Sequence, residues 1–225
     1  MITDGSIREG IFLSRRNRFT AQVLVDGETI LCHIHNTGRL QELFVEGAVV
    51  LLKKAENANR KTSYDLIAVR KGCGFVSVDS YAPNRAAGIF LRETFGTEAL
   101  IKPEAAYHQS RFDFFVETNN RRIFLEVKGV TLEKDGIALF PDAPTARGVK
   151  HLMELCDCVD DGYEAAVLFV IQFSPVRAMM PNKSQDPAFA KALKRAKEKG
   201  VHILAYDCDV SMDSLRLKNP VPVFL

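Results

Sequence analysis

The N-terminal third of the chain alternates apolar and polar positions in short runs that are separated by turn residues. The stretch "QVLVDGETILCHI" holds two apolar runs around Asp26-Gly27, which is a strong signal for a two-residue hairpin. "LFVEGAVVLLKKA" repeats this arrangement around Glu46-Gly47, and "SYDLIAVRKG" has the pattern of a further strand. About five short strands in roughly 70 residues predict a small β-barrel of the OB type.

The second part of the chain has a different pattern. "PNRAAGIFLRETFG" predicts a helix with Asn84 as its N-cap and Gly96 as its end, and a second helix is predicted to start after Thr145 as N-cap. "AAVLFVIQF" is typical of a central strand that is covered on both faces. A third amphipathic helix and the strand "VHILAYD" follow. The pattern therefore predicts an α+β protein, with an OB-like barrel over 1–82 and an α/β domain with a mixed sheet over 83–225.

The segment "RFDFFVETNNRRIFLEVKGV" reads as two strands joined by a turn at Asn119-Asn120. In this register one face of the hairpin is wholly apolar, with Phe112, Phe114 and Val116 opposite Val127, Leu125 and Ile123. The other face places Phe115 opposite Phe124 and Asp113 opposite Glu126, with Lys128 on the same face. Like charges directly opposite each other destabilise a sheet, so this acidic pair calls for a further explanation.

Two carboxylates in a partly dry site raise the pKa of one of them or recruit a cation. Magnesium binds a few carboxylates together with water and phosphate oxygens, and a nearby lysine can orient water or stabilise charge on a phosphate. The residues Asp113, Glu126 and Lys128 therefore predict a metal-dependent phosphodiester site. The alternative is a solvated face with scattered charges, against which Phe115 and Phe124 indicate that this face is covered.

Composition excludes some classes of protein but does not identify a binding partner. The chain is 47% hydrophobic and 26% charged, which is typical of a soluble globular protein. It has no apolar run of about 18 residues and its N-terminus does not have the pattern of a secretory signal, so we expect no membrane span. Five irregularly spaced cysteines indicate a reducing cytoplasm. The net charge is only +2, so any surface for nucleic acid must be local.

Several motifs together resemble the sugar fermentation stimulation protein A (SfsA) family. They are "NTGR" at Asn36–Arg39, "SRFDF", "LEVKGVTL", "FPDAPTARGVKHL" and the C-terminal "DPAFAKALKRAKEKGVHILAYDCDV". The hairpin also resembles the PD-(D/E)xK nuclease signature, although the proline before the aspartate is absent. The resemblance implies an N-terminal OB-like barrel, a restriction-endonuclease-like domain, DNA binding and a link to the regulation of sugar (maltose) metabolism.

The same resemblance suggests the residues of the site. Asp113, Glu126 and Lys128 take the nuclease-core positions. Glu104 and the carbonyl of Val127 are further candidate metal ligands, for Mg²⁺ with Mn²⁺ as a substitute. Candidate contacts to DNA lie in the barrel, where basic residues are mixed with aromatic ones, on the hairpin, and near the N-terminus of the helix predicted after Thr145, where free N–H groups favour phosphate. They are Arg15, Arg16, Arg18, Arg39, Arg60, Lys61, Arg111, Arg147 and Lys150.

Two functions stay open on the sequence. The first is a DNA-binding protein that regulates sugar metabolism, and the second is a Mg²⁺-dependent deoxyribonuclease that uses the same three residues. The alternative for each basic stretch is an ordinary solvated surface, and we expect His151 to lie on such a surface together with Arg147, Lys150 and Glu154. A sugar-processing enzyme is disfavoured, because no paired-carboxylate glycosidase pocket or nucleotide-binding loop is recognisable.

Overall fold

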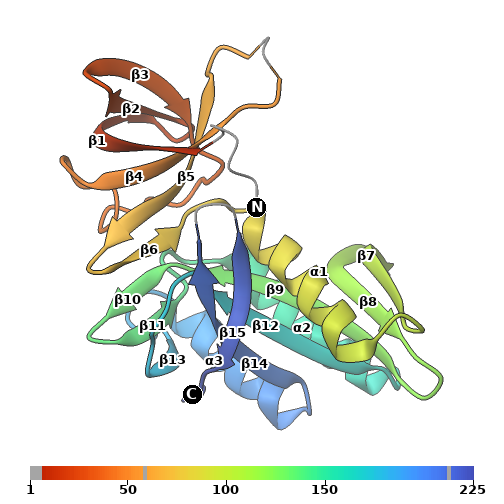
Figure 1. The fold of residues 1–225 in the computed structure, drawn as a ribbon. Helices are drawn as coiled ribbons and strands as arrows, with labels where there is room; N and C mark the ends of the chain where they lie inside the picture. Colours follow the sequence, from red (N-terminus) through yellow and green to blue (C-terminus); the bar gives the residue numbers. More distant parts are fainter. Residues whose placement is uncertain (1–6, 58–59, 212–213) are drawn as a thin grey trace.

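The computed structural model describes residues 7–57, 60–211 and 214–225. Its first part is a barrel whose strands follow the order β3-β2-β1-β4-β5-β6, and β3 also pairs with β5 and closes it (Figure 1). The strands are β1 (Ile7–Asn17), β2 (Thr20–Val25), β3 (Glu28–His33), β4 (Val49–Lys54), β5 (Tyr64–Lys71) and β6 (Gly74–Ser77). This confirms the predicted OB-like barrel.

The two hairpins predicted in the barrel have different outcomes. Asp26 and Gly27 both have positive φ, as a tight turn between antiparallel strands requires, and they join β2 to β3. The hairpin predicted around Glu46-Gly47 is wrong. The residues before it form a turn in which the N–H of Phe44 donates to the carbonyl of Leu40, and Gly47 donates to Phe12 of β1.

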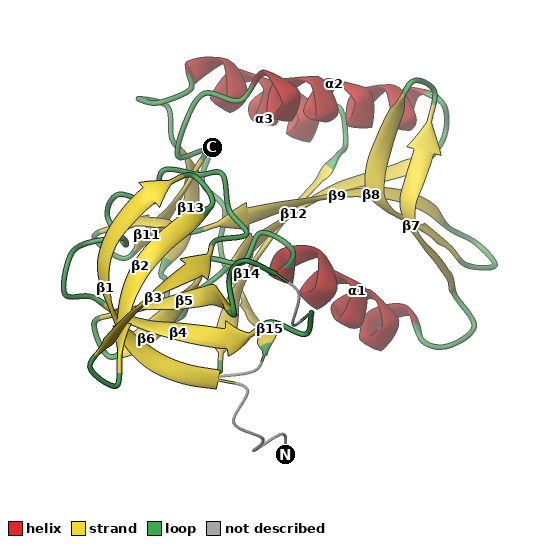
Figure 2. Ribbon diagram, turned by 90° about the horizontal axis from the view of Figure 1, so that it is seen from above, coloured by secondary structure: helices red, strands yellow, loops and turns green. Residues whose placement is uncertain are grey.

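The second part is an α/β unit built on a mixed sheet of order β15-β14-β12-β9-β8-β7, in which β12 runs parallel to both β9 and β14. In Figure 2, α2 and α3 cover one face of this sheet and α1 covers the other. A small sheet, β10-β11-β13, lies beside it. The bounds are α1 (Ala82–Phe95), β7 (Leu100–Tyr107), β8 (Ser110–Glu117), β9 (Arg122–Val130), β10 (Leu132–Lys134), β11 (Ile137–Phe140), α2 (Ala146–Asp160), β12 (Glu164–Ile171), β13 (Ala178–Pro181), α3 (Pro187–Glu198), β14 (His202–Val210) and β15 (Leu215–Pro220).

Helix caps agree with the sequence at two of three predicted positions. The side chain of Thr145 accepts a hydrogen bond from the N–H of Gly148, which confirms it as the N-cap of α2. Gly96 ends α1 with φ of 76°. The prediction that Asn84 caps α1 is wrong, because the N-cap is Tyr81 and the side chain of Asn84 points to a strand of the sheet instead.

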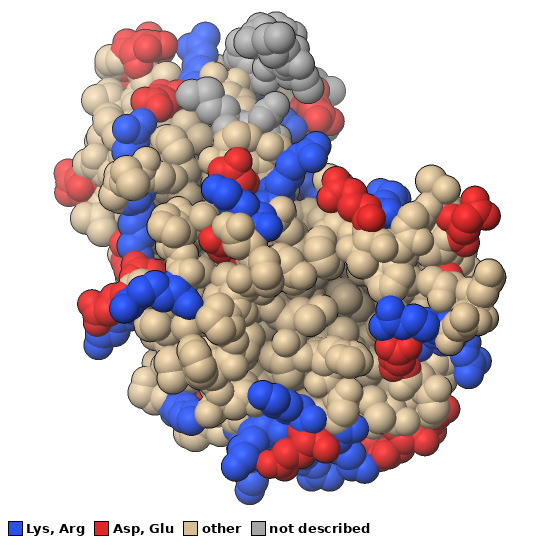
Figure 3. Space-filling model, turned by 60° about the horizontal axis from the view of Figure 1, so that its bottom comes forward, with Lys and Arg blue, Asp and Glu red and all other residues tan. Residues whose placement is uncertain are grey.

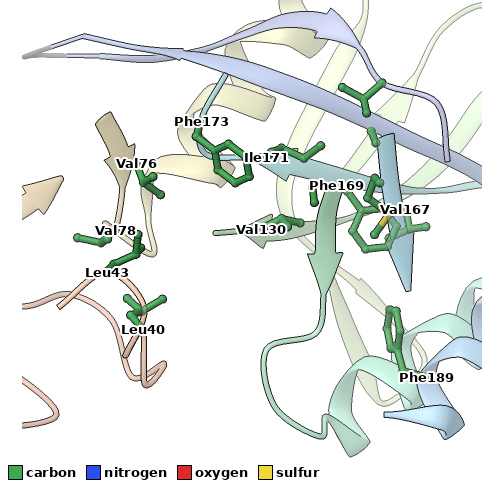
Figure 4. Packing of buried hydrophobic residues seen from close by; sticks show 14 of the residues in the cluster. Leu40, Leu43, Val76, Val78, Val130, Val167, Phe169, Ile171, Phe173 and Phe189 are labelled. Atoms are coloured by element: carbon green, nitrogen blue, oxygen red, sulfur yellow. The ribbon is translucent and has the colours of Figure 1, made fainter. Parts of the chain in front are cut away.

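One hydrophobic core runs from the barrel into the second part of the chain. Figure 4 shows Leu40, Leu43, Val76 and Val78 on the barrel side and Val130 and Phe173 on the other. Polar links join the same two parts: the N–H of Ser77 donates to the carbonyl of Gln172 at 3.0 Å, and Lys71 pairs with Glu133 at 2.6 Å. None of the helices in the described ranges is both long and apolar enough to span a membrane.

Candidate functional site

The hairpin of β8 and β9 has the predicted register near its turn. Phe115 pairs with Phe124 and Glu117 pairs with Arg122, and the N–H of Thr118 donates to the carbonyl of Arg121 at 2.9 Å. The ladder of paired residues ends at Phe114 and Leu125. The two strands therefore separate next to the predicted acidic pair.

Asp113 occupies the place where these strands separate. Its Oδ2 accepts a hydrogen bond from the N–H of Val127 at 2.7 Å, so the carboxylate replaces a main-chain acceptor. Its Oδ1 accepts a hydrogen bond from Nδ2 of Asn84 on α1, also at 2.7 Å. Asp113 is thus fixed by one residue of the adjacent strand and by the first turn of α1, which explains why Asn84 does not act as a cap.

The side-chain alternation of β8 breaks at the same position, which corrects the prediction of one continuous apolar face. Phe114 packs in the cluster beneath α1, whereas Phe112 packs in the other cluster, with its ring centroid 5.6 Å from that of Phe124. On the neighbouring strand β7, Glu104 lies between the partners of these two phenylalanines and has φ of +52°. Glu104 and Asp113 therefore lie opposite each other where the ladder between β7 and β8 is interrupted.

Glu126 is buried beneath α2, with 4% of its surface exposed. Its Oε1 accepts a hydrogen bond from Nζ of Lys128 at 2.6 Å and a second one from Nδ1 of His151, on α2. Nε of Arg147 donates to Nε2 of the same imidazole at 3.4 Å, so Nδ1 carries the proton that Glu126 accepts. Among the described residues, Oε2 of Glu126 is buried without a hydrogen-bond partner. The prediction that this face of the hairpin is covered is confirmed.

The surroundings drive the pKa values of the two carboxyl groups in opposite directions. Burial and the charge of Glu126 raise the pKa of Asp113, against the hydrogen bonds from Val127 and Asn84. Burial alone would raise the pKa of Glu126 as well, but the hydrogen bond from His151 and the charge of Lys128 outweigh it and lower that pKa. Glu126 is therefore held as a carboxylate, and Asp113 is the more readily protonated of the pair.

An open cavity of about 530 Å³ gives access to this pair. Asp113 and Glu126 lie in its wall, and Arg111 and Arg147 line it as well. Glu104 also lines it, but it is exposed and pairs with Arg111 at 3.3 Å, so it lies at the rim. Within residues 7–57, 60–211 and 214–225, no three His, Cys, Asp or Glu side chains gather in a way that could hold a metal ion. Two carboxyl groups of the hairpin therefore line the cavity, and a third lies at its rim.

Arg15 has a structural position that the sequence did not indicate. Its two terminal nitrogens donate four hydrogen bonds, of 2.7 to 2.9 Å, to the main-chain carbonyls of Gly38, Arg39, Arg18 and Asn36. Its Nε is buried and has no hydrogen-bond partner in the part of the chain that the structure describes, and its guanidinium lies 5.0 Å from the ring centroid of Phe44. Arg15 therefore holds the "NTGR" loop, in place of the phosphate contact that we expected.

The other basic candidates divide into free and paired side chains. Arg16, Arg18 and Arg39 are exposed and, among the described residues, have no acidic partner within 4.0 Å. Lys61 is also exposed. Two candidates are held by acids: Arg60 by Asp65 at 2.6 Å and Lys150 by Glu154 at 3.5 Å. On the face in Figure 3, basic and acidic side chains are interspersed around a broad uncharged area, so the basic surface there is local.

The predicted position of His151 on the surface is wrong. It lies on the buried face of α2 and is 5% exposed, rather than on a solvated face. A signal was present, because Gly148, Leu152 and Leu155 follow the i, i+4, i+7 pattern of a buried stripe and His151 is the i+3 member of it. A polar residue inside such a stripe needs a buried partner, and here the partner is Glu126.

The fold and the site together define a two-part protein: an OB domain followed by an α/β domain with a mixed sheet that carries a pair of carboxylates. Comparison with protein families gives the same division. The family model "SfsA N-terminal OB domain" matches residues 13–78, and the model "Sugar fermentation stimulation protein RE domain" matches residues 82–214. The chain belongs to the sugar fermentation stimulation protein (SfsA) family.

Individual relatives match along nearly the full chain. The sugar fermentation stimulation protein homolog of Ruminiclostridium cellulolyticum is 48% identical over 222 residues, which cover 98% of each chain. The homolog of Desulfitobacterium hafniense (strain DSM 10664 / DCB-2) is 49% identical over 98% of this chain and 97% of its own. A solved structure of Pyrococcus furiosus SfsA in complex with Ca²⁺ is 28% identical, with a TM-score of 0.88 over 99% of this chain and 97% of that one.

Proposed function

We propose that this protein binds DNA and that Asp113 and Glu126 hold a divalent cation which contacts the DNA backbone. The observation that carries the proposal is Oε2 of Glu126. A buried carboxylate oxygen without a hydrogen-bond partner is costly, and Glu126 lines an open cavity together with a second carboxylate, that of Asp113. A bound cation would provide the missing partner.

The donor set fits a hard cation that keeps part of its water shell. Magnesium in proteins commonly has one or two carboxylate ligands, with water and phosphate oxygens as the rest. Asp113 and Glu126 supply those carboxylates, and Glu104 and the carbonyl of Val127 are the further candidates. The cation would offset the repulsion between the two acids and bind a phosphate oxygen. That the Pyrococcus furiosus relative was solved in complex with Ca²⁺ supports a site for hard cations in the family.

The protein's own side chains hold the two carboxylates and provide positive charge around them. Lys128 and His151 orient Glu126, while Asn84 orients Asp113. Arg111 and Arg147 line the cavity, and Arg147 lies in the first turn of α2, where main-chain N–H groups favour anions. This arrangement suits a phosphate group that approaches the acids from the cavity.

A Mg²⁺-dependent deoxyribonuclease is the second candidate. Nζ of Lys128 lies 2.6 Å from Oε1 of Glu126, and the lysine side chain is 14% exposed, so its cationic group lies beside this carboxylate. In that position it can stabilise negative charge that develops on a phosphate. The regulation of sugar (maltose) metabolism is the physiological role that we propose for DNA binding, and it rests on the family alone.

One experiment separates these possibilities. Purified protein is incubated with plasmid, linear and single-stranded DNA at low salt, where phosphate contacts are strongest, with Mg²⁺, Mn²⁺ or EDTA. Cleavage that is lost in Glu126→Gln and in Lys128→Ala, but not in the exposed control Glu93→Gln, would establish the nuclease. Binding without cleavage favours the regulator. Absence of binding to every DNA at low salt refutes both.

A further inference from the structure

Four aromatic rings form a continuous row across the outside of the barrel as far as α1. Phe19 stacks on His33 with their centroids 6.4 Å apart, His33 contacts His35 at 4.3 Å, and His35 contacts Tyr81 at 5.5 Å. We propose that this row is a binding site for single-stranded nucleic acid, with bases stacked on its two end rings. The inference rests on the proposed DNA binding and adds the strand preference and the residues.

The end rings are available to a ligand. Phe19 is 49% exposed and Tyr81 is 62% exposed, which is unusual for large aromatic side chains. The two histidines between them are half-buried. They point outward because His33 and His35 alternate with Cys32 and Ile34, which are fully buried in the barrel.

Hydrogen bonds hold the backbone beside three of the four rings, those of Phe19, His35 and Tyr81. Oδ1 of Asn17 accepts from the N–H of Phe19 at 2.8 Å, and the carbonyl of Phe19 accepts from the N–H of Ile34. The carbonyl of His35 accepts from the N–H of Ser80 at 3.0 Å, which brings Tyr81 against that imidazole. A row that is ordered before binding has little conformational entropy to lose when a strand binds.

A free cation lies near each end of the row. The exposed Arg18 precedes Phe19, and among the described residues it has no acidic partner within 4.0 Å. At the other end, a cavity of about 670 Å³ is lined by His35 and Tyr81 and by charged residues of both signs, which are Lys53, Lys54, Arg85, Glu56, Asp65 and Asp79. Asp65 is held by Arg60 and Asp79 by Arg85, both at 2.6 Å, whereas Lys54 is exposed and has no such acidic partner in the described ranges. Exposed rings with a cation at each end suit a strand with a charged backbone and unpaired bases.

The row also leads towards the carboxylate site. Tyr81 is the N-cap of α1, and Asn84, three residues or about 4.5 Å further along the helix axis, donates to Asp113. In a duplex the base faces are stacked within the helix and cannot reach these rings. A strand with unpaired bases can stack on them, so we expect the row to discriminate between single-stranded and duplex DNA.

The test is fluorescence anisotropy with a labelled oligothymidine and a labelled duplex of equal length, in EDTA so that the carboxylate site holds no cation. The full chain is compared with Phe19→Ala, Tyr81→Ala and Phe224→Ala. Phe224 is the matched control, an aromatic residue that is 57% exposed and lies outside the row. Arg18→Ala reports the charge contribution. Thermal unfolding of each variant checks that the fold is intact.

We expect Phe19→Ala and Tyr81→Ala each to weaken binding of the oligothymidine by about 5- to 150-fold, the range for loss of one stacked base. Duplex binding and the dependence on salt should stay unchanged, and Phe224→Ala should bind as the wild type does. Arg18→Ala should flatten the salt dependence. If both ring variants bind the oligothymidine as the wild type does, or if they lose as much affinity for the duplex, the stacking role of the row is refuted and the proposed DNA binding still stands. A wild-type chain that binds no DNA, with or without Mg²⁺, overturns the proposed function as well.

Discussion

Replacement of His151 by alanine tests the buried network that organises the carboxylate site. The change removes the imidazole that donates to Glu126 and leaves Lys128 as the remaining partner of this carboxylate. The side chains of His151 and Glu126, taken without their main-chain atoms, are only 6% and 5% exposed. Water therefore does not readily replace the lost donor. The variant also loses the edge contact with Phe112, whose ring centroid lies 6.1 Å away.

The expected loss of stability follows from these contacts. A hydrogen bond to a charged group contributes about 1.5–3 kcal/mol, and the cavity left by the ring adds to that figure. We therefore expect a decrease of about 2–4 kcal/mol in the free energy of unfolding. For a chain of 225 residues, each kcal/mol lowers Tm by about 2–4 °C. His151→Asn retains an N–H donor near the position of Nδ1 and should lose about half as much.

The assay is urea or thermal unfolding of a double-mutant cycle that combines His151→Ala with Glu126→Gln. If the imidazole acts through Glu126, the two changes should couple by about 1–3 kcal/mol, because the first removes the hydrogen bond and the second removes the negative charge that strengthens it. Additivity to within about 0.5 kcal/mol would show that the two side chains are energetically independent and would refute the reasoning.

Three further predictions concern other parts of the chain. Arg15→Ala should lower stability by about 2–4 kcal/mol, since it removes four bonds to loop carbonyls, whereas Arg16→Ala should change it by less than about 0.5 kcal/mol in the same unfolding assay. The hydrogen bond from Lys71 lowers the pKa of Glu133, so this link stabilises the fold above the unfolded-state pKa of about 4.3 and is lost as the pH falls through the lower folded value. Glu133→Gln should therefore be less stable than the wild type at pH 7 and equal to it once both forms are neutral, as urea titrations along the pH scale would show. Arg147→Ala should weaken binding to all DNA sequences alike and reduce the slope of log K against log salt by about 0.9.

The sequence predicted those features of the fold that depend on local chemistry. The turn at Asn119-Asn120 fixed the register of the hairpin, and Thr145 marked the start of α2, because both signals act within a few residues. The change of pattern after the barrel predicted the order of the two domains, and the family resemblance implied the same order. Glu46-Gly47 shows the limit of local signals: the same pattern as Asp26-Gly27 forms no hairpin, since its hydrogen bonds go to β1.

The site was only partly predictable, since three of its features come from contacts between distant segments. Asn84 has the chemistry of a cap but lies against Asp113, and this follows from the packing of α1 on the sheet. His151 was expected on the surface, and the placement of α2 over the hairpin buries it against Glu126. Arg15 lies in a stretch of basic and aromatic residues that is typical of a phosphate contact, but the fold of the "NTGR" loop surrounds it with carbonyls. The residue types indicated which hydrogen bonds these three side chains can form, whereas the partners that they bond to follow from the tertiary structure.

The cation site at Asp113 and Glu126 is the central claim, and calorimetric titration with Ca²⁺ and Mg²⁺ tests it most directly. Wild-type protein should bind about one cation per chain, and Glu126→Gln should abolish that binding while its unfolding transition stays cooperative. The control Glu93→Gln, an exposed acid on α1, should bind as the wild type does. Equal cation binding by wild type and Glu126→Gln would contradict the assignment of the site.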